Sequence, residues 1–276
     1  MAKFPSILHR RDTYIERIKP FMGTPIVKVM IGHRRVGKSF ILFQLIDLIK
    51  SKEKDANVIY INKEDIEFVD MVSYKELHNY ISEQLVSDRK NYIFIDEIQE
   101  IADFKVAIRS LVLDDNNDIY ITGSNSEMFS SDLANELGGR YVEFRIYSLS
   151  YLEFLNFHNL PNDEESLEKY THFGGLPYLI HLPFDEAVIM EYINSVYSTI
   201  VLRDVIERKK IRSTAFLEQL IRFLANNTGS LFSSKSISDF LKSQKVNISS
   251  NQVSEYADSL AEAFVVHRIG RYDIVG

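Results

Sequence analysis

The chain has 276 residues, of which 45% are hydrophobic and 26% are charged, a composition typical of a globular protein with one to three domains. It contains no cysteine, so disulfides, thiolate metal sites and a cysteine nucleophile are excluded. The net charge of −7 argues against a nucleic-acid-binding surface along the whole chain, although a local basic patch stays open.

The sequence also bears on where the protein is located in the cell and on whether it holds a metal ion. No stretch reaches the eighteen apolar residues of a membrane span, and the first residues lack the long apolar segment of a signal peptide. The seven histidines are scattered without metal-ligand spacing, which favours core or surface roles over a zinc site. We therefore expect a cytoplasmic protein with no membrane segment.

The first expected helix runs from Arg10 to Met22 and has apolar residues at helical spacing. The basic pair Arg10 and Arg11 leads into it, and Tyr14 is a candidate contact for an adenine ring. Plain surface and packing roles are the simpler interpretation of these three side chains.

A phosphate-binding loop follows a buried strand. Ile26 to Ile31 is apolar and β-branched, Gly32 to Ser39 matches G-x-x-x-x-G-K-[ST], and Phe40 to Lys50 suits a helix. The glycines bring backbone N–H groups against a polyphosphate, Lys38 is a point charge for the β- and γ-phosphates, and the Ser39 hydroxyl can ligate Mg²⁺. The predicted nucleotide contacts here are Gly32, His33, Arg34, Arg35, Val36, Gly37, Lys38, Ser39 and Phe40.

The second diagnostic stretch is an apolar strand that ends in an acidic pair. After an expected strand at 57–61 and a helix at 74–86, residues 91–95 run into Asp96 and Glu97. This is the form of a Walker B strand, in which Asp96 holds Mg²⁺ opposite Ser39 and Glu97 is the general base for the attacking water. A strand that merely ends in an acidic turn is the alternative, but the phosphate loop upstream favours the catalytic interpretation.

Three later polar residues, in two stretches, are further candidates for catalysis. Ser124 and Asn125 follow the strand at 118–122 and could sense the γ-phosphate, or Asn125 could cap the next helix. Arg140 follows two glycines and precedes a strand at 141–146. It could stabilise transition-state charge in this subunit or a neighbouring one, or it could be a salt-bridged surface arginine.

From Leu149 onward helices replace strands, with a Gly-Gly-Leu-Pro turn at 174–177 and a long helix at 184–209. Three helices (215–225, 236–243 and 249–264) and a strand at 265–269 then form a winged-helix pattern. Residues 213–276 carry six Lys or Arg and six Asp or Glu, and the third helix has three acidic and no basic residues. DNA readout by this helix is therefore not favoured.

Together these stretches resemble prokaryotic AAA-type ATPases close to the archaeal-ATPase and STAND-like groups, which often carry a C-terminal region of unknown function. The marks are the phosphate loop, the strand into Asp96-Glu97, Thr122-Gly123-Ser124, Gly139-Arg140-Tyr141, Leu149-Ser150-Tyr151 with Glu153-Phe154, Gly174 to Pro177, and Arg203-Asp204.

The resemblance implies three domains: an α/β P-loop core at 1–147, whose Walker A and Walker B strands are separated by another strand, a helical lid at 148–211, and a winged helix at 212–276. It also implies that Pro177 contacts the adenine and that Arg140 is the family's glycine-flanked arginine.

Two features depart from the family pattern. Ser148 stands where the family usually has proline, with Tyr151 in place of phenylalanine. The sequence also ends in the expected wing, where relatives usually continue into a nuclease-like fold, so we expect a truncated or shortened member.

The leading functional hypothesis is a Mg²⁺-dependent ATPase that acts as a conformational switch or small motor. Preference for ATP over GTP is implied by the resemblance alone. One alternative is a nucleotide-regulated module with little turnover whose winged helix binds a protein partner or a second copy of the chain. Another is a DNA-handling ATPase.

Overall fold

The computed structural model describes residues 9–125, 136–207, 211, 213–243 and 248–270. The chain divides into two compact units, Met1–Ile193 and Asn194–Gly276. The first part of the predicted lid, residues 148–193, shares the first unit with the sheet, while the rest of it and its predicted boundary at 211/212 fall in the second unit.

The first unit is built on a five-stranded parallel sheet, which confirms the predicted α/β class. Its strands are β1 (Val27–Ile31), β2 (Asn57–Asn62), β3 (Asn91–Asp96), β4 (Asn117–Gly123) and β5 (Tyr141–Arg145). Their order is β2-β3-β4-β1-β5, so β4 separates the strands that carry the two phosphate-site motifs. Every residue of β1, β3 and β4 is buried, as expected for central strands covered on both faces.

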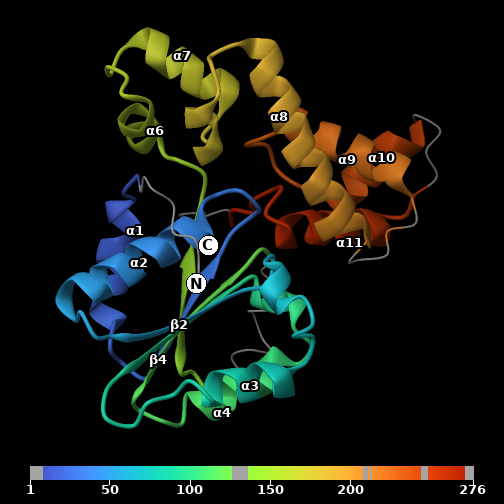
Figure 1. The fold of residues 1–276 in the computed structure, drawn as a ribbon. Helices are drawn as coiled ribbons and strands as arrows, with labels where there is room; N and C mark the ends of the chain where they lie inside the picture. Colours follow the sequence, from blue (N-terminus) through green and yellow to red (C-terminus); the bar gives the residue numbers. More distant parts are fainter. Residues whose placement is uncertain (1–8, 126–135, 208–210, 212, 244–247, 271–276) are drawn as a thin grey trace, which may run out of the picture. The chain divides into compact units, whose positions relative to one another are not determined.

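Helices cover both faces of the sheet. Figure 1 shows α1 (Asp12–Ile18) and α2 (Lys38–Lys52) on one side, and α3 (Tyr74–Ser82) and α4 (Phe104–Leu111) on the other. The start of α3 is fixed by a capping box between Ser73 and Glu76. α2, α3 and α4 connect successive strands of the parallel sheet, as crossover helices must, and α1 leads into β1.

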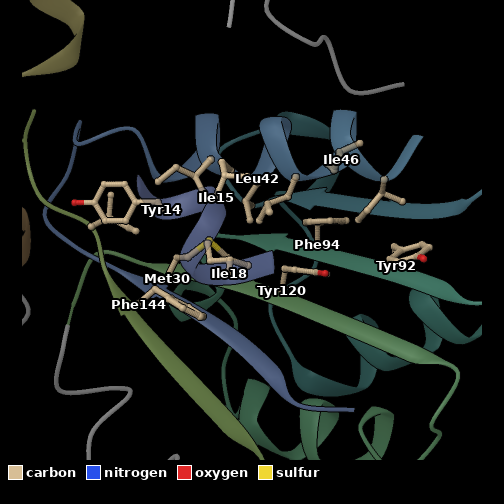
Figure 2. Close-up of a cluster of buried hydrophobic side chains, with 14 of the residues drawn as sticks. Tyr14, Ile15, Ile18, Met30, Leu42, Ile46, Tyr92, Phe94, Tyr120 and Phe144 are labelled. Atoms are coloured by element: carbon tan, nitrogen blue, oxygen red, sulfur yellow. The ribbon is translucent and has the colours of Figure 1, made fainter. Parts of the chain in front are cut away.

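Aromatic side chains fill the core between the sheet and the α1–α2 layer (Figure 2). Met30, Tyr92, Phe94, Tyr120 and Phe144 come from β1, β3, β4 and β5 and pack against apolar residues of the two helices. The rings of Phe94 and Tyr120 are stacked, with centroids 4.4 Å apart. Alternate strand residues face this core because successive side chains in a strand point to opposite faces.

Tyr14 of α1 belongs to the same core. Its ring is buried, and its hydroxyl accepts a hydrogen bond from the Tyr147 N–H at 3.1 Å. The structure therefore gives Tyr14 a packing role.

A charged network is buried at the amino ends of β1 and β4. The fully buried Lys28 ammonium forms an ion pair with Asp118 and donates to the Thr24 carbonyl at 2.9 Å. Asp118 also accepts hydrogen bonds from the Gly23 N–H at 2.7 Å and the Tyr120 hydroxyl at 2.8 Å. Burial lowers the pKa of Lys28, and the Asp118 carboxylate opposes that shift.

After the sheet come α6 (Tyr151–His158), α7 (Glu164–Phe173), the 3₁₀-helix η5 (Pro177–His181) and α8 (Glu186–Thr199). Ser150 caps α6: its hydroxyl accepts from the Glu153 N–H, and the Glu153 carboxylate accepts from the Ser150 N–H at 2.9 Å. The predicted long helix is present as α8 followed by a π-helical segment, η6 (Ile200–Glu207).

After the end of α8 and η6, the described residues of the second unit form α9 (Thr214–Asn226), α10 (Ser234–Ser243) and α11 (Ser250–Glu262). They match the predicted helices closely, and their apolar faces form a core that includes Leu217, Leu220 and Leu260.

The strand predicted at 265–269 is wrong. The described residues after α11 form turns and irregular chain, and the N–H groups of Val265 and Val266 donate back to the Leu260 carbonyl. These two N–H groups bond a carbonyl in the last turns of α11, so they are not used for strand pairing. The described residues therefore contain the three helices predicted for a winged helix but not its predicted strand.

Candidate functional site

The phosphate loop connects the carboxyl end of β1 to the first turn of α2. Gly37 has φ 91° and Arg35 has φ 68°, so both lie in the left-handed region that turns the chain sharply into the helix. Gly32 is needed for packing, since a Cβ there would lie 2.2 Å from the Ile146 carbonyl oxygen. The loop thus presents the positive end of the 15-residue helix α2 at this edge of the sheet.

Several side chains of the loop have partners or surroundings outside it. His33 contacts the Ser148 hydroxyl through Nε2 at 3.2 Å, and Arg34 donates to Glu64 at 3.2 Å. Val36 is buried, Arg35 is exposed, and Phe40 lies 44% exposed on the first turn of α2.

Lys38 lies over the centre of the loop. Its ammonium donates to the carbonyls of Gly32 at 3.0 Å and His33 at 3.2 Å. It also lies 3.3 Å from the Glu97 carboxylate, which joins the phosphate loop to the end of β3.

Asp96 ends β3 next to the first turn of α2. Its carboxylate accepts hydrogen bonds from the hydroxyls of Thr122, Tyr60 (3.3 Å) and Ser39. Burial raises the pKa of Asp96, and the bonds from Ser39 and Thr122 offset part of that rise. The hydroxyl and carboxylate oxygens are ligands that Mg²⁺ prefers, and a cation beside them would favour the charged form of Asp96.

No group of three or more His, Asp or Glu side chains within the described ranges could hold a metal ion. Ser39 and Asp96 fit the usual magnesium site of such a loop, which is completed by phosphate oxygens and water instead of further side chains.

Glu97 is held from several sides. Its backbone is left-handed, with φ 56°, and its N–H donates to the Thr122 hydroxyl at 3.0 Å. The carboxylate accepts a hydrogen bond from the Gln99 amide and faces Lys38. Burial alone raises the pKa of Glu97, but Lys38 and Gln99 outweigh it and hold the pKa below its ordinary value. The carboxylate is therefore ionised at neutral pH, as a general base must be.

Ser124 and Asn125 are both buried at the carboxyl end of β4. The Ser124 hydroxyl accepts a hydrogen bond from the Gln99 amide at 3.2 Å, so Gln99 links Ser124 to Glu97. The alternative role of Asn125 as a helix cap concerns residues 126–135, which lie outside the described residues.

Pro177 lies beside the phosphate loop, since a Cβ placed on Gly37 would be 3.8 Å from its ring. The turn reaches this position because Gly175 packs directly on the backbone of Leu149. The Leu149 N–H donates to the Gly175 carbonyl at 2.7 Å, and a Cβ on Gly175 would lie 2.3 Å from the Leu149 carbonyl oxygen. The structure thus brings Pro177 and the loop together.

Arg140 lies at the opposite edge of the sheet. It precedes β5, its carbonyl accepts from the Val27 N–H at 3.0 Å, and Val27 is the first residue of β1. Five strand residues, about 16 Å at 3.3 Å per residue, separate this level from the phosphate loop. Arg140 is exposed and is not brought to the phosphate loop of its own chain. Arg140 is therefore not placed to stabilise transition-state charge on a nucleotide bound by its own subunit, which was one of its predicted roles.

Comparison with known proteins is consistent with this geometry. A family model described as an AAA domain matches residues 24–155, and one for a domain of unknown function (DUF8612) matches residues 164–274. An uncharacterized protein of Haemophilus influenzae is 34% identical over 272 residues, which cover 96% of this chain and 68% of the relative. The chain belongs to the AAA-domain family.

A second relative, the uncharacterized protein MJ1544 of Methanocaldococcus jannaschii, is 31% identical over 257 residues, 89% of this chain and 57% of the relative. The AAA-domain chain thus spans between about half and two thirds of these relatives' length.

Two solved structures are similar to this AAA-domain chain at low sequence identity. Orc1 of Aeropyrum pernix in complex with DNA has a TM-score of 0.44 at 12% identity, covering 97% of this chain and 87% of that one. AMPPCP-bound DnaA from Aquifex aeolicus has a TM-score of 0.43 at 14% identity, covering 95% and 91%. Among the described residues, no helix combines the length and apolar character that crossing a bilayer requires.

Two side chains of the AAA-domain site were assigned no role from the sequence, although Thr122 was among the marks of the family resemblance. Thr122 bonds both Asp96 and the Glu97 backbone, and Gln99 bonds Glu97 and Ser124. Gln99 stands two residues after Glu97, which was a usable signal. No sequence spacing indicates the role of Thr122, because only the parallel pairing of β3 with β4 puts it beside Asp96 and Glu97.

Proposed function

We propose that this AAA-domain chain binds ATP with Mg²⁺ and hydrolyses it. The observation that carries the proposal is the meeting of three groups at one edge of the sheet. Lys38 lies in the phosphate loop, Asp96 bonds Ser39, and the buried Glu97 lies 3.3 Å from Lys38. This set provides phosphate binding, a cation site and a base, which together constitute the machinery of phosphoanhydride hydrolysis.

In the proposed reaction the loop backbone and Lys38 hold the β- and γ-phosphates. Glu97 accepts a proton from the water that attacks the γ-phosphorus. The bond to the β–γ bridging oxygen breaks, and ADP leaves with that electron pair. Mg²⁺ held near Ser39 and Asp96 would offset the negative charge on the phosphate oxygens. Ser124 and Asn125 lie where they could orient the water or sense the γ-phosphate.

We further propose that nucleotide binding acts as a conformational switch through the helices that follow the sheet. Pro177 lies beside the loop and is the candidate adenine contact, so its turn would respond directly to an occupied site. The three helices of the second unit would be the helical part of a winged helix that receives this signal and binds a protein partner or a second copy of the chain. A role for Arg140 would require a neighbouring subunit.

One observation favours slow intrinsic turnover, the behaviour of a regulated binding module. The carboxylate of Glu97 is already engaged by Lys38 and Gln99, and a base must be released from such contacts before it can accept a proton. A DNA-handling ATPase has less support, because residues 213–276 carry six Lys or Arg and six Asp or Glu, and α11 carries no basic residue.

The deciding experiment measures steady-state ATP hydrolysis and ADP binding for the wild type and Glu97→Gln. Loss of the base should lower the rate by about a hundredfold or more and leave ADP binding intact. Glu67→Gln removes an exposed carboxylate near the same edge and is the matched control, with unchanged rate. Binding without turnover in either protein would overturn the enzyme and leave the regulated module, whereas absence of ADP binding would overturn both.

A further inference from the structure

Arg11 is almost completely buried, with 2% of its surface exposed, and connects parts of the chain that are distant in sequence. Its guanidinium donates to the Val36 carbonyl of the phosphate loop at 2.9 Å. It also donates to both carboxylate oxygens of Glu153, at 2.9 and 3.0 Å, and to the Tyr147 carbonyl at 3.0 Å. A planar guanidinium satisfies these acceptors together because its five N–H groups have fixed directions.

The bond to Val36 fixes the orientation of one peptide group of the loop. In a planar trans peptide, the C=O of one residue and the N–H of the next point in opposite directions. With the Val36 carbonyl held toward Arg11, the Gly37 N–H is directed to the other side of this peptide, away from Arg11. Gly37 is the N-cap of α2 and has a left-handed backbone. Because glycine has wide conformational freedom, the peptide between Val36 and Gly37 could rotate without the bond from Arg11.

The bonds to Glu153 connect this peptide to α6. Glu153 is the third residue of that helix and closes its capping box with Ser150. Burial alone raises the pKa of Glu153, but hydrogen bonds from Arg11 and Ser150 outweigh it and hold the pKa below its ordinary value, so the carboxylate is charged at neutral pH. The segment between the sheet and α6 is held at the same place, through Tyr147 to Arg11 and through Ser148 to His33.

We propose that Arg11 is a positioning residue for the phosphate site: it orients the Gly37 N–H toward bound phosphate and, through Glu153, couples phosphate occupancy to α6. This inference rests on the proposed function, since it assumes that the loop binds phosphate. The coupling works in both directions, because a phosphate that stabilises the oriented peptide also stabilises the Arg11–Glu153 pair.

The test uses inorganic pyrophosphate as the probe, with binding measured by calorimetry for the wild type, Arg11→Lys and Arg17→Lys. Lysine keeps the charge of Arg11 but cannot bond Val36 and Glu153 in the same fork, so pyrophosphate affinity should fall about ten- to a hundredfold. Arg17 is exposed on the same helix and serves as the control, with unchanged affinity. Equal affinity of the wild type and a folded Arg11→Lys would overturn the inference alone. Absence of pyrophosphate binding by the wild type would overturn the proposed function as well.

Hydrogen exchange in α6 separates positioning from mere structural support and remains decisive if Arg11→Lys does not fold. In the wild type, pyrophosphate should slow exchange of the α6 amides. In Glu153→Gln the bond from Arg11 to Val36 remains, so pyrophosphate should still bind while its effect on α6 is lost. An unchanged α6 in the wild type, or the same slowing in Glu153→Gln, would overturn the coupling.

Discussion

The two edges of the parallel sheet each bury a lysine beside a carboxylate, but the two pairs are built differently. At the amino edge, Lys28 and Asp118 are fully buried, and every partner named above comes from the adjoining strand or turn. At the carboxyl edge, Lys38 and Glu97 lie 3.3 Å apart with small residual exposure, and Lys38 also donates to two carbonyls of the loop.

The difference teaches how one residue pair can serve two purposes. The amino-edge pair is enclosed by the Thr24 carbonyl, the Gly23 N–H and the Tyr120 hydroxyl, and it contributes to the fold. The carboxyl-edge pair borders the phosphate loop, and under the proposed function a bound polyphosphate would replace Glu97 as the partner of Lys38. Both pairs consist of a lysine and a carboxylate. Their surroundings therefore decide whether the pair is structural or can exchange one partner for a ligand.

The largest effect is expected at the amino edge. Lys28→Met leaves Asp118 charged and buried without its cation, so the free energy of unfolding should fall by about 3–5 kcal/mol. Chemical denaturation monitored by circular dichroism measures this directly. Lys52→Met, at an exposed lysine, should change it by less than about 0.5 kcal/mol.

A double variant sharpens this prediction. Lys28→Met with Asp118→Asn removes both charges and keeps an oxygen acceptor for the Gly23 N–H and the Tyr120 hydroxyl. Most of the lost stability should return, since the penalty comes from an unpaired charge. If the double variant is as unstable as the single one, the amino-edge pair is not acting through its charge.

A smaller stability effect is expected from the equivalent change at the carboxyl edge. Lys38→Met leaves Glu97 bonded to Gln99, so the free energy of unfolding should fall by under about 2 kcal/mol. Affinity for ADP, measured by calorimetry, should nevertheless fall about ten- to a hundredfold through the lost charge-assisted bonds to phosphate. A loss of stability equal to that of Lys28→Met would erase the distinction between the two edges.

The smallest effect is in the pH dependence of stability. The pKa of Glu97 is lowered in the folded chain, so its contribution is present above its unfolded pKa of about 4.3 and is lost as pH falls through the folded value. The free energy of unfolding should therefore decline less steeply below about pH 5 in Glu97→Gln than in the wild type. Denaturation series at several acid pH values check the slope, and parallel slopes would contradict the prediction.

Local motifs made much of this site predictable. Gly32 to Ser39 and the pair Asp96-Glu97 are contiguous in sequence, and an apolar strand before each fixed which edge of a parallel sheet they occupy. The same logic was available for Arg140: a residue that precedes a parallel strand lies at the edge opposite one that follows it.

Two other features depended on contacts distant in sequence. The apolar run 265–269 has strand composition, but a strand needs a partner, and its first N–H groups bond the end of α11 instead. Arg11 looked like a surface residue because its carboxylate partner, Glu153, is 142 residues away.

That separation has a consequence for the time course of synthesis. At roughly 5–20 residues per second, Arg11 is made about 7–30 s before Glu153. Burying the guanidinium without its carboxylate is costly, so Arg11 stays hydrated during this interval. The contacts through which Arg11 holds the start of α1 against α6 therefore form only after α6 has emerged from the ribosome.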